Sequence, residues 1–66
     1  MQILLNGTSK AIPEPHTITA LLAGIGLGER RVAVEVNGAI IPRGAHAEHQ
    51  LHEGDRVEIV HALGGG

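Results

Sequence analysis

The last four residues of the chain, Leu63-Gly64-Gly65-Gly66, are the part of the sequence best suited to chemistry. Three consecutive glycines carry no Cβ and are costly to order, so they predict a flexible tail. Fully extended, the three residues reach about 10 Å, at ~3.3–3.6 Å per residue. Such a tail could enter a channel too narrow for any side chain and deliver the terminal carboxylate of Gly66 to a partner. The alternative interpretation is a frayed end or a cloning remnant.

Histidines form the second candidate group, because His46, His49 and His52 are spaced by three residues. On a helix they would share one face and could bind a metal ion. Gly44 precedes them, however, and no carboxylate completes a tetrahedral ligand set. The pattern therefore favours solvated histidines and predicts no metal site.

Several short elements must position these groups. Two Asn-Gly pairs, at Asn6-Gly7 and Asn37-Gly38, are typical of type I′ turns and predict two hairpins. Thr17 is the expected N-cap of a helix whose apolar residues recur with a period of 3.6. The expected strands cover residues 2–5, 8–12, 31–36, 39–41 and 56–62, and the helix runs from residue 18 to the glycines at 24, 26 and 28.

This order of elements predicts an α+β fold, in which a mixed sheet wraps around one main helix. The last strand follows a long return connection, so it can lie centrally beside the first strand. The expected core comprises Ile3, Leu5, Ile18, Leu21, Leu22, Ile25, Val32, Val34, Val57 and Ile59.

One face of the predicted sheet has no helix to cover it. Leu4, Val60 and Ala62 alternate with core residues of their strands and should point toward this open face. They are either scattered surface residues or, with Leu63 at the rim, a docking patch beside the tail.

Composition narrows the classes of function. The chain has 66 residues, room for one domain over residues 1–63 and the tail over residues 64–66. It is 42% hydrophobic with a net charge of −2 and no aromatic residues, which argues against a nucleic-acid binder. The absence of cysteine rules out disulfides and thiolate chemistry. No apolar run is long enough to span a membrane and no signal peptide is evident, so we expect a cytoplasmic protein.

Four stretches together resemble the ThiS family of sulfur carrier proteins in thiamine biosynthesis. They are MQILLNG at the start, TITALL in the predicted helix, VAVEVNGAIIPR in the middle and LHEGDRVEIVHALGGG at the end. The ending is the most specific of these, and the resemblance covers nearly the whole chain. It implies a ubiquitin-like β-grasp fold, in agreement with the predicted order of elements.

The resemblance also implies a mechanism that centres on Gly66. A ThiF-like enzyme would use ATP to convert its carboxylate into an acyl-adenylate, and a persulfide protein would supply sulfur to give a thiocarboxylate. A ThiG-like thiazole synthase would accept that sulfur, while Gly64 and Gly65 thread the tail. The chain itself would be a carrier and not an enzyme, with no permanently bound cofactor.

Three other functions stay open. The small subunit of molybdopterin synthase has the same fold and tail chemistry, although the shorter chain and the opening and central motifs favour the thiamine branch. A ubiquitin-like modifier or interaction module would join its tail to amines. A histidine-dependent metal-binding protein would purify with stoichiometric metal.

Overall fold

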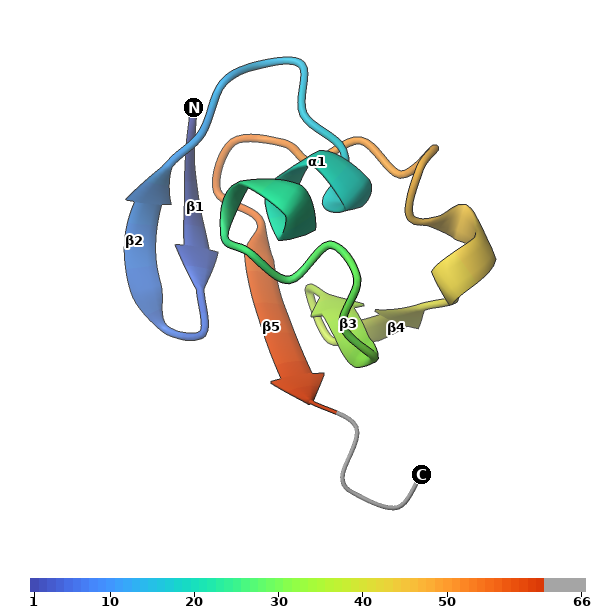
Figure 1. Cartoon of the computed structure of the whole chain (residues 1–66). Helices are drawn as coiled ribbons and strands as arrows, with labels where there is room; N and C mark the ends of the chain where they lie inside the picture. The colour runs from blue at the N-terminus through green and yellow to red at the C-terminus, as the bar shows by residue number, and fades with distance from the viewer. Residues whose placement is uncertain (62–66) are drawn as a thin grey trace.

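The computed structural model describes residues 1–61, and residues 62–66 lie outside its description (Figure 1). Residues 1–61 form five strands, one α-helix and one short 3-10 helix. The strands are β1 (Gln2–Leu5), β2 (Thr8–Ala11), β3 (Val32–Val36), β4 (Ala39–Ile41) and β5 (Arg56–His61). The α-helix is α1 (Ile18–Gly24), and the 3-10 helix η1 (Arg43–Ala45) follows β4.

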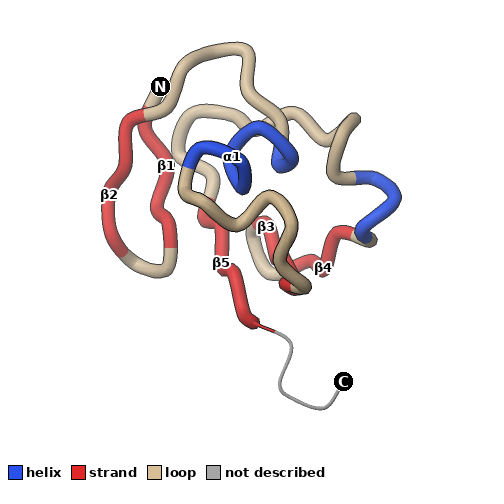
Figure 2. The backbone as a smooth tube through the Cα atoms, viewed as in Figure 1, coloured by secondary structure: helices blue, strands red, loops and turns tan. Residues whose placement is uncertain are grey.

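The strands form a single mixed sheet in the order β2-β1-β5-β3-β4, with β5 in the centre. β5 runs parallel to β1 and antiparallel to β3, and the two hairpins β1–β2 and β3–β4 form the flanks. Figure 2 shows α1 lying across one face of this sheet. The predicted mixed sheet around one helix, with a central last strand, is confirmed.

Both hairpins turn at their Asn-Gly pairs, as the sequence predicts. Asn6 and Gly7 have φ values of 49° and 85°, and Asn37 and Gly38 have values of 53° and 87°. Positive φ at both central residues defines the type I′ turn, whose twist matches that of the flanking strands. The turns therefore fix the register of both hairpins.

Helix α1 begins at its predicted cap. The Oγ1 atom of Thr17 accepts a hydrogen bond from the backbone N–H of Ala20 at 3.1 Å. This bond satisfies one of the N–H groups that a helix leaves unpaired at its first turn. The helix buries Ile18, Leu21 and Leu22 against the sheet and ends at Gly24.

The core differs from the expected list at three residues. Seven expected residues are buried: Ile3, Ile18, Leu21, Leu22, Val34, Val57 and Ile59. Leu5, Ile25 and Val32 are only half-buried and pack at its margin. The core also includes Ile12, Val36 and Leu51, which the predicted list leaves out. Ile12 lies in the irregular segment before α1, and Leu51 lies in the connector between η1 and β5.

Candidate functional site

The candidate site is the C-terminal end of β5 together with the sheet face that α1 leaves open. The tail residues predicted to carry the chemistry, Gly64, Gly65 and Gly66, lie outside the described residues, as do the predicted docking residues Ala62 and Leu63. The described part of the site is therefore the strand that leads to the tail and the surface beside it. None of the helices in residues 1–61 is long and apolar enough to cross a membrane.

β5 pairs with β1 at its start and with β3 up to its last described residue. On one side Val57 pairs with Leu5 of β1, and the Asn6 N–H donates to the Val57 carbonyl at 2.9 Å. On the other side Val60 pairs with Ala33 and His61 with Val32 of β3. The end of β5 that precedes the tail is therefore held by its pairing with β3.

The side chains of two turn asparagines also bind β5. The Oδ1 atom of Asn6 accepts a hydrogen bond from the Ile59 N–H at 2.8 Å, and Oδ1 of Asn37 accepts one from the Arg56 N–H at 2.9 Å. Each asparagine thus makes its own turn and fastens that turn to the central strand. This double role is not evident from the turn motif alone.

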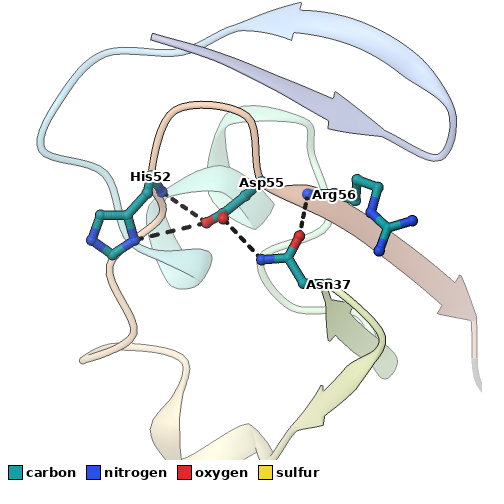
Figure 3. Close-up of polar contacts among 4 residues, drawn as sticks. All are labelled: Asn37, His52, Asp55 and Arg56. Atoms are coloured by element: carbon teal, nitrogen blue, oxygen red, sulfur yellow. Dashed lines mark hydrogen bonds and ion pairs between the residues drawn. The ribbon is translucent and has the colours of Figure 1, made fainter.

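Asp55 completes the network around the start of β5 (Figure 3). Its Oδ1 accepts a hydrogen bond from the Asn37 amide Nδ2 at 3.0 Å, and its Oδ2 accepts one from the His52 backbone N–H at 2.8 Å. The imidazole Nδ1 of His52 lies 3.9 Å from the same carboxylate. Through these contacts, Asn37 of the Asn-Gly turn and Asp55 of the Glu-Gly-Asp turn join the β3–β4 hairpin to β5.

The open face of the sheet is apolar beside the tail strand. Leu4 is 41% exposed and Val60 is 57% exposed, so both point away from the core as predicted. Ile40, which the sequence analysis does not single out, is 69% exposed. Ile40 pairs with Glu35, which lies between the core residues Val34 and Val36 and therefore points to the open face. This register is the signal that could have found Ile40.

Charged side chains lie between these apolar positions. Glu35 of β3 and Glu58 of β5 are direct cross-strand neighbours. Like charges in this arrangement repel each other and destabilise a sheet. Together with Leu4 and Arg56 they line a hollow of about 240 Å³. The exposed apolar residues could contact an apolar side chain of a partner, and the two glutamates could contact a cationic side chain beside it.

The histidines do not behave as one solvated group. His46 is only 6% exposed, and its ring Nε2 lies 3.0 Å from the carbonyl oxygen of Ile41, so the prediction of a solvated side chain is wrong for this residue. Its backbone carbonyl also accepts from the Thr19 N–H at 3.2 Å. His49 is half-buried, and the side chain of His52 is 78% exposed.

The histidines of residues 1–61 do not belong to a ready set of metal ligands. Within residues 1–61, no three His, Cys, Asp or Glu side chains are placed so that they could hold a metal ion. The three-residue spacing does not put the histidines on one helical face, because only the 3-10 helix Arg43–Ala45 forms in this connector. His16 is half-buried and His61 is exposed.

Comparisons with known proteins agree with this geometry. Residues 3–66 match the model of the ThiS family. The sulfur carrier protein ThiS of Escherichia coli K12 is 29% identical over 66 residues, which cover 100% of both chains. The crystal structure of the thiamine biosynthesis protein (ThiS) from Geobacter metallireducens superposes with a TM-score of 0.87 at 30% identity, again over 100% of both chains. This likeness confirms the expected β-grasp fold.

Larger proteins also contain a segment similar to this chain. The thiazole synthase of Paramagnetospirillum magneticum is 38% identical over 66 residues, which cover 100% of this chain and 20% of that protein. The chain therefore spans about a fifth of the length of the thiazole synthases that it matches.

Proposed function

Because the chain belongs to the ThiS family, we propose that it is a sulfur carrier protein of thiamine biosynthesis whose reactive group is the carboxylate of Gly66. The observation that carries this proposal is the family match over residues 3–66, which extends through the final glycines. The full-length similarity to a sulfur carrier protein and the similarity to segments of thiazole synthases favour the thiamine branch over the molybdopterin branch.

The chemistry follows from the weakness of a carboxylate as an electrophile. A ThiF-like enzyme activates the Gly66 carboxylate: one of its oxygens attacks the α-phosphorus of ATP, pyrophosphate leaves and an acyl-adenylate forms. The terminal sulfur of a protein persulfide then attacks the acyl carbon, and AMP leaves. A second thiol cleaves the resulting S–S bond, taking the disulfide and releasing the thiocarboxylate. The adenylate and thiocarboxylate are transient, and the carrier needs no permanent cofactor.

The sulfur acceptor is a ThiG-like thiazole synthase. Thiazole synthases that contain a segment similar to the whole of this chain support this choice, because a carrier and its acceptor benefit from being joined. A covalent link raises the effective concentration of one for the other.

The carrier contributes reach and recognition, while its partners contribute catalysis. Gly64 and Gly65 thread the tail into a narrow channel, because neither has a side chain. Leu4 and Val60, exposed on the open face, dock against the partner beside the tail, and Ala62 and Leu63 extend this surface. Glu35 and Glu58 outnumber Arg56 in the hollow that they share, which favours a partner surface that presents a cation.

Mass spectrometry of the intact protein tests the proposal. The full chain is incubated with ATP, a ThiF-like adenylating enzyme, a persulfide donor and a thiol. We expect one terminal oxygen to be replaced by sulfur, and the sulfur to disappear when a thiazole synthase and its substrates are added. An unchanged mass in all conditions would contradict the proposal. An isopeptide bond between Gly66 and a lysine would instead identify a ubiquitin-like modifier.

A further inference from the structure

A small cavity beside α1 gathers positive charge. It has a volume of about 130 Å³ and lies between the helix, the segment that leads into β3 and the connector after β4. Its lining includes Thr19, Gly28, Arg30, Val32, Arg43 and His46. A water molecule takes up about 30 Å³ in the liquid, so the cavity has room for an anion of several heavy atoms.

Two arginines from distant parts of the sequence line this cavity. Arg30 and Arg43 are two of only five Lys and Arg residues in a chain with a net charge of −2. No carboxylate lines the cavity. Within residues 1–61, neither guanidinium makes an ion pair or a side-chain hydrogen bond to another residue. Both arginines are exposed, so solvent screens their mutual repulsion. With no carboxylate in the lining, they nevertheless give the cavity a positive field that favours an anion.

His46 fixes the geometry of the cavity and is a positioning residue. Its ring Nε2 donates to the Ile41 carbonyl at 3.0 Å, and its backbone N–H donates to the Arg43 carbonyl at 3.1 Å. Its own carbonyl accepts from the Thr19 N–H at 3.2 Å. These bonds tie the turn that carries Arg43 to the start of α1. One wall of the cavity is therefore held in place before any ligand binds.

We propose that this cavity binds a doubly charged tetrahedral oxyanion, either inorganic phosphate or the phosphate group of a small ester. Two guanidinium groups match the charge of such an anion, and each offers a fork of N–H donors to its oxygens. The Thr19 hydroxyl adds a neutral donor on the helix side of the cavity. This binding does not depend on the sulfur chemistry of the tail, so either proposal can fail without the other.

Titration of the ¹⁵N-labelled full chain with inorganic phosphate tests the site. Sodium chloride keeps the ionic strength constant, and amide chemical shifts are followed. We expect saturable shifts confined to the cavity, above all at Thr19, Gly28 and Arg30. Replacing phosphate by AMP, with adenosine as the blank, distinguishes a free ion from an ester: shifts with AMP show that esters are accepted, and shifts with phosphate alone show a site for the free ion.

Arginine variants distinguish a specific anion site from general electrostatic attraction of phosphate to the protein. Arg30→Gln or Arg43→Gln should weaken binding at least about tenfold, since each removes one of the two charged donors to the anion. Arg31→Gln removes the same charge from an exposed neighbour that does not line the cavity, and should change binding less than about twofold. Absence of saturable shifts with both phosphate and AMP would overturn the proposal. So would equal weakening in the Arg30→Gln and Arg31→Gln proteins.

Discussion

The carboxamide oxygen of Asn6 accepts a hydrogen bond from the backbone N–H of Ile59 at 2.8 Å, although the two residues are 53 positions apart. β1 ends at Leu5, so the Asn6 side chain continues the bonding of β5 one step beyond the strand. The first turn of the chain thereby helps to hold the strand that leads to the tail. Asn6 therefore supplies both a positive φ for the turn and the hydrogen bond that tethers the turn to β5.

Replacing Asn6 separates these two roles. Asn6→Gly keeps the positive φ without steric cost but removes the acceptor for the Ile59 N–H. We expect the free energy of unfolding to fall by about 1–3 kcal/mol, because a partly buried donor loses its partner. Aspartate tolerates the same φ and keeps an acceptor oxygen, so Asn6→Asp should lower the free energy of unfolding less than Asn6→Gly does. Urea unfolding curves measure both, and a glycine variant as stable as the aspartate variant would contradict the role of the tether.

Core packing under the helix gives a second prediction. Leu21 is 1% exposed on α1, and Leu21→Ala should lower the free energy of unfolding by about 2–5 kcal/mol through lost burial and a residual cavity. Domains of this size have total stabilities near or below the low end of ~5–15 kcal/mol, so the variant should be largely unfolded near physiological temperature.

A matched control is Leu4→Ala, which removes the same atoms from a side chain that is 41% exposed. It should cost clearly less than Leu21→Ala, because the deleted methyl groups leave no enclosed void. Circular dichroism during heating measures both variants. A cooperative melt of Leu21→Ala with an unchanged midpoint would show that this side chain does not support the core.

Local patterns in the sequence are sufficient to predict most of the fold. Asn-Gly pairs place the turns, the alternation of Val32, Val34 and Val36 identifies a one-sided strand, and Thr17 marks the helix start. The outward direction of Leu4 and Val60 follows from the same alternation. These features depend on a few neighbouring residues, so the sequence alone carries them.

Burial in irregular segments could not be predicted in this way. Leu51 is buried because its N–H donates to the His16 carbonyl at 2.8 Å and Gln50 bridges Thr17, which brings the connector against the segment before α1. His46 is buried by the same return of the chain over the helix. Neither residue lies in a helix or strand, and contacts between distant segments decide their environment.

The open face should govern docking without supporting the fold. Val60 is 57% exposed, so Val60→Asp should leave the melting temperature nearly unchanged. In the complex with an adenylating enzyme, the new carboxylate would be buried without a partner, and the rate of adenylation at limiting carrier concentration should fall by at least about tenfold. The release of pyrophosphate from ATP measures this rate.

Ala47→Asp provides the control for charge. It adds the same carboxylate at an exposed position in the connector, away from the sheet face. Adenylation of this variant should stay close to that of the parent protein. Normal adenylation of the Val60→Asp protein would exclude the open face as the docking surface, and unfolding of that protein would show that Val60 supports the core.

Two changes to the tail test whether Gly66 carries the reactive acyl group. Deleting Gly66 shortens the reach by about 3.5 Å, and a misplacement of even ~1 Å can cost roughly 100-fold in rate. Gly65→Val keeps the length but adds a branched side chain that should block a narrow channel. Both proteins should melt like the parent, because the tail is proposed to act only in the partner's active site.

After activation, mass spectra should show sulfur on the parent and on neither variant. Efficient sulfur loading of the shortened chain would contradict the assignment, and loss of folding would make the tail structural.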